Sequence, residues 1–140
     1  MASMTQTQIE AFLQAPRNAI VATNAGDGPP QVSPVWYLYE GGRLYISTSS
    51  RTAKVRNLRR DPRVTICVDG CPPDYRYVLI RGRVAIVENG APLQEEMRWR
   101  IIRRYYEDEE SARAYHEATR DASQVLLVVE PERIIGEDFN

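Results

Sequence analysis

The close spacing of strand-like segments constrains the fold of this chain more than any other feature. Most of these segments are separated by short turns such as Gly41-Gly42. A parallel pair of strands needs a crossover of a dozen or more residues, whereas an antiparallel hairpin needs only a short turn. The spacing therefore predicts an antiparallel sheet, curled into a small barrel, over residues 19–23, 31–39, 44–48, 63–68 and 75–87.

Two of these strands carry marks of irregularity. In the strand 31–39, Pro34 lacks a backbone donor, which predicts an edge position or a bulge. Alternation along this strand places Trp36 on one face and Tyr37 on the other. In the strand 75–87, Gly82 predicts a bulge.

Helix signals flank and interrupt the strands. Thr5 and Gln8 have the spacing of a capping box, which predicts a first helix that Pro16 ends. Pro92 begins a helix that runs to about Tyr106, and a shorter helix follows an acidic run. The apolar stripe of the longer helix consists of Leu93, Met97, Ile101 and Tyr105. Two short strands, 125–129 and 133–135, complete a mainly β, α+β chain.

Length and composition fit one domain, residues 1–140. The chain has 140 residues, with 43% hydrophobic and 26% charged residues, which is ordinary for a globular protein. The N-terminal MASMTQTQIE lacks the pattern of a secretion signal, and no apolar run approaches the ~20 residues of a membrane span. We therefore expect a cytoplasmic protein that does not associate with membranes.

The two cysteines give little sign of special chemistry. Cys67 and Cys71 are four residues apart in a loop-like setting, and the only histidine, His116, is distant in sequence. A structural zinc site needs about four ligands. We expect two ordinary thiols and no metal, with a redox or metal role as the alternative.

The basic residues are more informative. Of the 18 cationic side chains, 17 are arginine, and Lys54 is the only lysine. A single lysine against this bias suggests a site that requires a compact ammonium rather than a planar guanidinium, although it could also be a chance surface residue.

Lys54 lies in the segment STSSRTAKVRNLRRDPR, where a strand runs directly into a helix. The first turn of a helix has free N–H groups and a partial positive charge, so it accepts phosphate. The hydroxyls of Ser47, Thr48 and Ser49 add donors, and helical periodicity places Arg51 and Lys54 on one inward side. The pattern predicts a phosphate site.

Two other interpretations of this segment remain open. It could be a capped surface helix with a solvated basic face. Its six cations could also contact nucleic acid, but few aromatic residues lie among them and the chain has a net charge of −1, so we expect no nucleic-acid partner. The sequence has no other catalytic signature, and a bound cofactor would then supply the reactive atom.

The same segment carries a family resemblance. RTAKVRNLRRDPRV, between the strands LYIST and VTICV, resembles the pyridoxamine-phosphate-oxidase-like flavin and deazaflavin oxidoreductases. The segments AIVATNAGDGPPQ, PPQVSPVWYLYEGGRLY and VLLVVEPERIIGEDF resemble the same family in the same order. The resemblance implies an antiparallel split β-barrel of the FMN-binding type, with flanking helices. It also implies a homodimer that binds cofactor in two interface grooves.

The resemblance also implies roles for particular residues. The phosphate-binding pair of the family matches Arg51 and Lys54, and its hydroxyl contacts match Ser47, Thr48 and Ser49. The strand beside the cofactor ring matches Ser33, Pro34, Val35 and Trp36. Asn57 matches an asparagine that follows the lysine in the family, and its role could be limited to bracing the helix. Tyr77 is a candidate contact from the partner chain.

The short form with NLRRDPR resembles the branch that uses coenzyme F-420, an 8-hydroxy-5-deazaflavin, with FMN as the alternative. The oxidases proper are longer and carry a C-terminal substrate-binding extension, so we expect a different substrate. The leading hypothesis is hydride transfer to an unsaturated small organic molecule, with Tyr37, Tyr77 or water as proton donor. The alternatives are an FMN-binding oxidase-like protein, a non-catalytic cofactor carrier or sensor, and a haem or tetrapyrrole binder.

Overall fold

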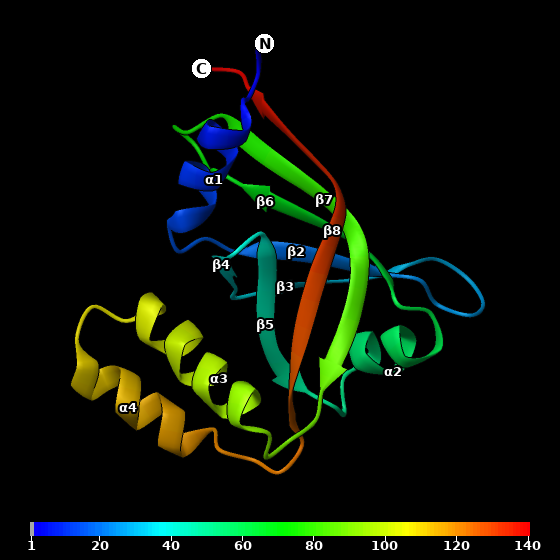
Figure 1. The fold of residues 1–140 in the computed structure, drawn as a ribbon, viewed down its shortest axis with the longest axis vertical. Coiled ribbons are helices and arrows are strands. Elements are labelled where there is room, and N and C mark those ends of the chain that lie inside the picture. The colour runs from blue at the N-terminus through cyan, green and yellow to red at the C-terminus, as the bar shows by residue number, and fades with distance from the viewer. Residues whose placement is uncertain (1) are drawn as a thin grey trace.

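One curled antiparallel sheet dominates the computed structural model, which describes residues 2–140 (Figure 1). Its strands are β1 (Ala2–Ser3), β2 (Ala19–Thr23), β3 (Gln31–Val35), β4 (Leu38–Glu40), β5 (Arg43–Ser49), β6 (Arg63–Asp69), β7 (Arg76–Val87) and β8 (Gln124–Asp138). They lie in the order β3-β2-β6-β7-β8-β5-β4, and β1 pairs with β8. The predicted antiparallel pairing is confirmed.

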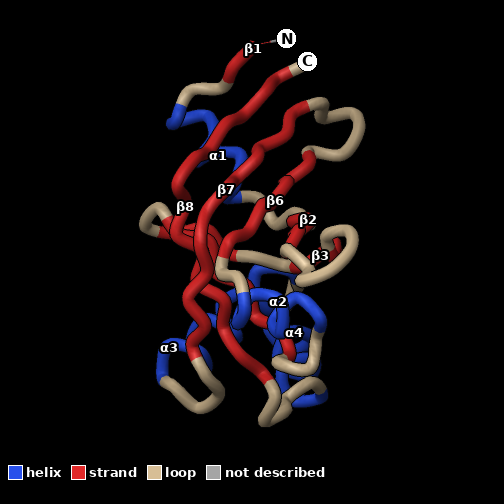
Figure 2. The backbone as a smooth tube through the Cα atoms, turned by 90° about the vertical axis from the view of Figure 1, so that its right-hand side faces the viewer, coloured by secondary structure: helices blue, strands red, loops and turns tan. Residues whose placement is uncertain are grey.

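The connection between β3 and β4 forces the sheet to curl. These strands lie at opposite edges of the sheet, yet only Trp36 and Tyr37 separate them in sequence. The three Cα–Cα steps from Val35 to Leu38 span at most ~11 Å, so the two edges must approach each other. The result is the α+β split barrel that the sequence predicted, with the long strands β6, β7 and β8 side by side along it (Figure 2).

The predicted continuous strand 31–39 is wrong, because Trp36 and Tyr37 interrupt it. The backbone N–H of Tyr37 donates to the hydroxyl of Tyr105 at 3.1 Å, and its carbonyl accepts from Nε of Arg104 at 2.7 Å. These two side chains replace the backbone partners of a sheet ladder, and the chain turns from one edge of the barrel to the other. The predicted alternation of faces is nevertheless confirmed, with Tyr37 in the barrel core and Trp36 outside it.

The two predicted C-terminal strands are a single strand, β8. Its register with β7 shifts between Arg81 and Gly82, where Gly82 lies opposite Pro131. Pro131 has no backbone N–H to donate to the sheet. Because it lies at this irregularity, the missing donor does not end the strand, and β8 continues past it. The shift confirms the bulge predicted at Gly82.

Within residues 2–140, four helices surround the barrel: α1 (Gln6–Gln14), α2 (Ala53–Arg60), α3 (Pro92–Tyr105) and α4 (Glu109–Ala118). The capping box of Thr5 and Gln8 forms as predicted, with bonds of 3.2 Å and 2.8 Å. Figure 1 shows α1 near the end that carries both termini, with α3 and α4 together at the opposite end. None of the described helices is long and apolar enough to cross a lipid bilayer.

Alternation along the strands creates two hydrophobic clusters. In β8, Val125, Leu127 and Val129 point into the barrel, whereas Leu126 packs against Met97 and Ile101 of α3. The predicted apolar stripe of α3 is therefore confirmed, except at Leu93 in the first turn, which is exposed. Packing on the outside of the barrel fixes α3 beside the ends of β3 and β5.

Candidate cofactor-binding site

A cavity of about 430 Å³ lies between the barrel and the helices. Its wall comes from the end of β3 and the residue that follows, from β5, and from α2, α3 and α4. It is lined by Asn18, Pro34, Val35, Trp36, Ser47, Thr48, Lys54, Arg98, Ile101, Ile102, Tyr115, Thr119 and Gln124. This volume is within the usual range for small-molecule and cofactor sites.

Lys54 is the most unusual group in this wall. It is only 7% exposed, its Nζ lies 3.5 Å from Oγ1 of Thr48, and it forms no salt bridge with any carboxylate of residues 2–140. Burial lowers the pKa of its ammonium. A buried cation without a counter-ion is costly, so the site favours an anion at this point of the cavity.

The first turn of α2 adds donors beside Lys54. Its N-cap residue, Thr52, makes no side-chain bond to the helix and instead donates through Oγ1 to the carbonyl of Ser49 at 2.8 Å. The first-turn N–H groups therefore lack a capping side chain, and the partial positive charge of the helix start is available. The hydroxyls of Ser47 and Thr48 line the same cavity.

Six of the residues expected at the site line this one cavity: Pro34, Val35, Trp36, Ser47, Thr48 and Lys54. Ser33 precedes them on β3, and its hydroxyl is buried without a hydrogen-bond partner in the described chain. Ser49 is not among the lining residues, because its hydroxyl bonds to that of Ser123 at 2.8 Å and accepts from the N–H of Arg51.

The predicted orientation of Arg51 is wrong. Helical periodicity was expected to place it beside Lys54, but α2 begins at Ala53, so Arg51 belongs to the preceding turn and is exposed. Its carbonyl accepts from Nη1 of Arg56 at 2.6 Å. Lys54, in contrast, is buried on the inward side as predicted.

Asn57 and Tyr77 lie outside the cavity wall. Nδ2 of Asn57 donates to Oγ1 of the buried Thr23 at 3.1 Å, so this side chain braces α2 against β2. Tyr77 stacks on Phe139 with ring centres 6.1 Å apart, near the start of β7. Its expected contact with a partner chain stays a prediction.

An aromatic cluster adjoins the cavity, and two of its members, Trp36 and Tyr115, line it. The ring of Trp36 is stacked on that of Tyr105, with centres 4.7 Å apart and planes inclined by 6°, and it also contacts Tyr106 and Tyr115. The sequence singled out Trp36 but not its partners, although Tyr105 lay on the predicted apolar stripe. The cluster ties the end of β3 to α3 and α4.

Tyr37 is excluded as a proton donor within this cavity. Its side chain is fully buried in the barrel, and its hydroxyl donates to the carbonyls of Leu13 and Ala15 at 3.0 Å and 3.1 Å. Tyr115 is the tyrosine that lines the cavity among the described residues. Tyr115 was not predicted as a site residue, because nothing in the sequence of α4 indicates that this helix lies near β3.

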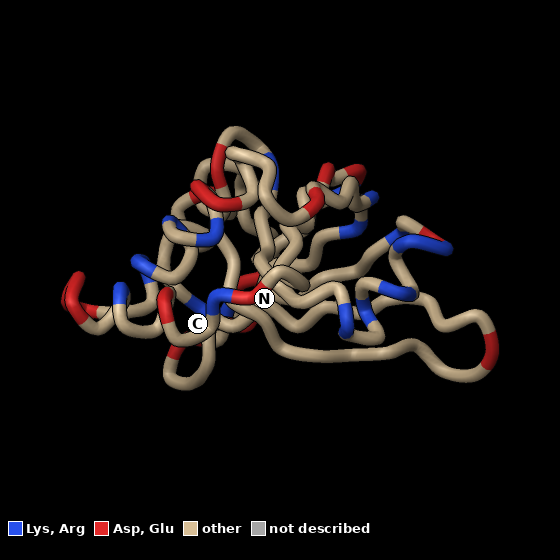
Figure 3. The backbone as a smooth tube through the Cα atoms, turned by 90° about the horizontal axis from the view of Figure 1, so that it is seen from below, with Lys and Arg blue, Asp and Glu red and all other residues tan. Residues whose placement is uncertain are grey.

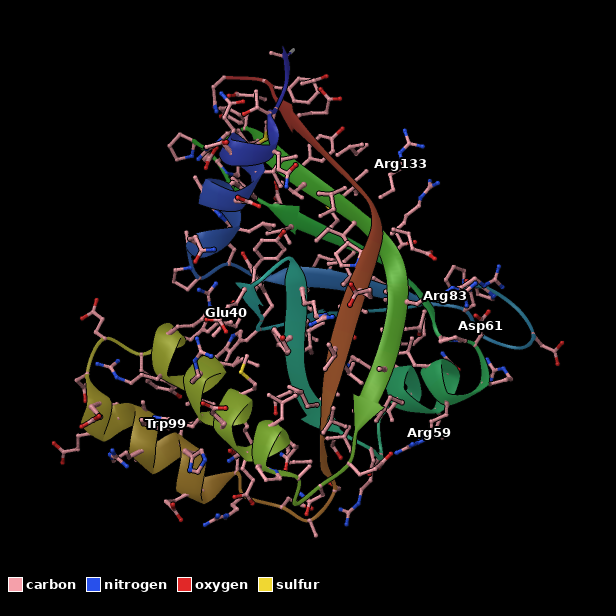
Figure 4. The ribbon with its side chains drawn as sticks, in the orientation of Figure 1. Glu40, Arg59, Asp61, Arg83, Trp99 and Arg133 are labelled. Atoms are coloured by element: carbon pink, nitrogen blue, oxygen red, sulfur yellow. The ribbon has the colours of Figure 1, made fainter. Side chains whose placement is uncertain are left out.

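His116 and the cysteines occupy ordinary positions. The ring of His116 lies in a T-shaped arrangement with that of Trp99, with ring centres 5.5 Å apart, between α3 and α4. Figure 4 labels Trp99. Cys67 and Cys71 are unpaired thiols, and burial raises the pKa of Cys67. Both cysteines are free thiols, as expected, and His116 packs between two helices.

The basic residues of α2 divide between the cavity and the solvent. Figure 3 shows several basic positions on the right, the side where Figure 1 places α2, and others on the left. Arg59 points away from the barrel in Figure 4 and forms a bidentate pair with Glu88 at 2.9 Å and 3.0 Å. Its charge is therefore matched at the surface, whereas that of Lys54 is not.

The chain is similar to known proteins over almost its whole length. The family model for pyridoxamine 5'-phosphate oxidase matches residues 5–137. The chain belongs to this family. Among solved structures, the chain is similar to an F420 reductase, which is 27% identical over 89% of this chain and 94% of its own, with a TM-score of 0.70.

Two further structures support the assignment of the fold. A conserved hypothetical protein from Mycobacterium tuberculosis is 26% identical over 96% of this chain and 85% of its own, with a TM-score of 0.79. A pyridoxamine 5'-phosphate oxidase-related, FMN-binding protein from Nostoc punctiforme is 17% identical over 87% and 74%, with a TM-score of 0.65. The chain therefore has the split-barrel fold that these structures share.

Proposed function

We propose that this chain is a dimeric oxidoreductase that transfers hydride between coenzyme F-420 and an unsaturated small organic molecule. The observation that carries the proposal is Lys54, a buried cation without a carboxylate partner in the wall of a cofactor-sized cavity. The similarity to an F420 reductase favours the deazaflavin. FMN is the alternative cofactor, because the chain is also similar to an FMN-binding protein.

The residues present suit a phosphorylated ribityl chain. Lys54, the hydroxyls of Ser47 and Thr48 and the first turn of α2 would hold the phosphate. Pro34–Trp36 would lie against the ring system, where the unpartnered hydroxyl of Ser33 is a nearby polar group. When bound, such a cofactor supplies a ring atom that accepts or donates hydride. The chain contributes orientation and the exclusion of water.

A second copy of the chain would cover an apolar row on the outside of the sheet. Strand registers place Pro34, Ile20, Cys67, Leu79 and Ile135 side by side across β3, β2, β6, β7 and β8. Ile20 and Ile135 are each 37% exposed. Contiguous apolar surface of this kind is typical of protein interfaces, and this row supports the proposed homodimer.

Titration of the apo-protein with F-420 and with FMN, followed by cofactor fluorescence, tests the proposal. We expect saturable binding of F-420 that is tighter than that of FMN, and the reverse order would favour the FMN alternative. Binding of neither cofactor would contradict the proposed function.

Turnover distinguishes an enzyme from a carrier or sensor. Reduced cofactor is mixed with the protein and a panel of enones, quinones and tetrapyrroles, and its oxidation is followed by absorbance. We expect oxidation with at least one class of acceptor. Tight binding without any oxidation across the panel would favour the carrier.

A further inference from the structure

Arg98 forms a partition between two cavities. The residue is only 5% exposed, and it lines both the 430 Å³ cavity and a second one of about 210 Å³. The larger cavity has an apolar wall that includes Trp36, Ile101 and Ile102. The smaller cavity is mostly polar, with Gln94 and His116 in its wall.

The hydrogen bonds of Arg98 use only one of its nitrogen atoms. Nη2 donates to the carbonyl of His116 at 3.0 Å and to Oγ1 of Thr119 at 2.7 Å. These bonds tie α3 to the C-terminal end of α4, where a positive charge is favourable. Nε and Nη1 make no hydrogen bond within residues 2–140, and no carboxylate there lies within 4.0 Å of the guanidinium.

The other arginines of α3 provide a contrast. Arg100 forms a bidentate pair with Glu40 at 2.7 Å and 2.9 Å, and Arg103 donates to the carbonyl of Tyr106 at 2.8 Å. Arg104 donates to the carbonyls of Tyr37, Gln14 and Ala15. Their donors meet charged or backbone partners, whereas Arg98 is the most buried of the four and keeps unused donors.

We propose, on the basis of the proposed function, that Arg98 binds the carboxylate of an organic acid substrate whose unsaturated, apolar body lies in the larger cavity. A guanidinium donates strong, charge-assisted hydrogen bonds to a carboxylate. The apolar wall on one side and the polar cavity on the other suit a substrate with these two ends. Burial lowers the pKa of Arg98, and an anionic ligand would offset the cost of this buried charge.

The phosphate of the cofactor has other partners in the cavity. Lys54, Ser47 and Thr48 come from β5 and α2, whereas Arg98 comes from α3. The two buried cations therefore sit on different elements of one wall. This arrangement suits two separate anions, one on the cofactor and one on the substrate.

Paired probes that differ only in charge test this inference. The probes are trans-cinnamate and cinnamamide, and their dissociation constants are measured calorimetrically on protein saturated with the cofactor that binds more tightly. We expect the wild type to prefer cinnamate by about 10- to 100-fold, as for a charge-assisted hydrogen bond. We expect Arg98→Gln to reduce this preference to within about threefold, and Arg100→Gln, the matched control on the same helix, to retain it.

Three results would overturn the inference. The first is equal binding of both probes by the wild type, and the second is an unchanged preference in Arg98→Gln. The third is a loss of cofactor affinity in Arg98→Gln with the probe preference retained, because the guanidinium would then serve the cofactor. If neither cofactor binds, the proposed function fails, and the same probe ratio on the cofactor-free protein still tests Arg98.

A measurement on the wild type covers the case in which Arg98→Gln does not fold. The Nε–H resonance of Arg98, assigned by its absence in Arg98→Lys, is followed by nitrogen-15 NMR as each probe is added. We expect the chemical shift of this resonance to change when cinnamate is added and to stay the same when cinnamamide is added. A resonance that is insensitive to cinnamate would contradict direct binding.

Discussion

At the scale of residues, the cavity wall combines two buried cations with apolar and aromatic side chains. Lys54 and Arg98 are 7% and 5% exposed, and neither has a carboxylate partner among the described residues. Surface arginines such as Arg59 and Arg100 are paired with glutamates. Since burying an unpaired charge costs folding free energy, an anionic ligand at either cation would offset that cost.

Lys54 was predictable from the sequence, and Arg98 was not. A lone lysine among 17 arginines, immediately after a run of hydroxyl residues, distinguished Lys54. Arg98 lies on the same side of α3 as Ile101 and Ile102, but an arginine there can also extend to solvent, and its contacts with α4 hold it inside. Tertiary contacts of this kind leave no periodic signal in a single sequence.

Tyr37 gives a prediction of pH-dependent stability. Burial raises its pKa to about 12, above the ordinary value of 10.0. The resulting stabilisation is complete below pH 10 and is lost as the pH rises through about 12. We expect Tyr37→Phe to lose about 1–3 kcal/mol of unfolding free energy at pH 7, because the carbonyl of Leu13 loses its donor.

Urea unfolding at pH 7, 10 and 11 measures both effects. Above pH 10 the free energy of unfolding of Tyr37→Phe should fall less steeply than that of the wild type. Tyr75→Phe, at an exposed position, is the control and should follow the wild type. Equal slopes for Tyr37→Phe and the wild type would show that this hydroxyl does not titrate as described.

At the scale of elements, the position of the site depends on how β3, β4 and α3 meet. The sequence predicted the strand 31–39 and the helix 92–106 separately, but not that Tyr105 and Arg104 would bond to the backbone of Tyr37. Those bonds break the strand and place Trp36 against α3. Hydrophobic alternation could predict which face of the strand each residue occupies. The interruption of the strand depends on contacts of Tyr37 with residues 67 and 68 positions later in the sequence.

The bulge between β7 and β8 yields a prediction about Gly82. A Cβ atom at this position would overlap the carbonyl of Glu130 on the paired strand. We expect Gly82→Ala to lower the free energy of unfolding by about 1–3 kcal/mol, as for overpacking in a tight core. Urea denaturation measures the change.

Gly26→Ala is the matched control for this substitution. Its Cβ would meet only the flexible side chain of Arg60, at 3.4 Å. The control should stay within about 0.5 kcal/mol of the wild type, as is usual for surface positions. Similar losses in both variants would mean that the bulge does not require glycine.

At the scale of the whole molecule, the short β3–β4 connection and the strand spacing determine the barrel. The strand spacing is a local feature of the chain and made the antiparallel barrel predictable from the sequence, whereas the β3–β4 connection interrupts what was predicted as a single strand, 31–39. The apolar row on the outside of the sheet could not be predicted, because its residues come together only through the register of the paired strands. The row consists of Pro34, Ile20, Cys67, Leu79 and Ile135. Each of these residues looks unremarkable within its own strand.

The apolar row predicts the oligomeric state. We expect light scattering after size-exclusion chromatography to give a mass of about twice the 16.0 kDa chain. Leu79→Glu places a charge in the middle of the row and should shift the mass to that of one chain. Leu93→Glu, at an exposed apolar position on α3 away from the row, should elute as the wild type does. A wild type that runs as one chain would rule out the dimer.

The central claim is that Lys54 and the start of α2 bind the phosphate of the cofactor, and a comparison of cofactors with and without phosphate tests it most directly. Dissociation constants are measured by fluorescence for FMN and riboflavin, and for F-420 and its phosphate-free deazariboflavin, with wild type, Lys54→Ala and Arg59→Ala. For the cofactor that binds, we predict that the wild type prefers the phosphorylated compound by about 10- to 100-fold, as for a charge-assisted hydrogen bond. Lys54→Ala should lose most of this preference, and Arg59→Ala should keep it. An unchanged preference in Lys54→Ala would contradict the account.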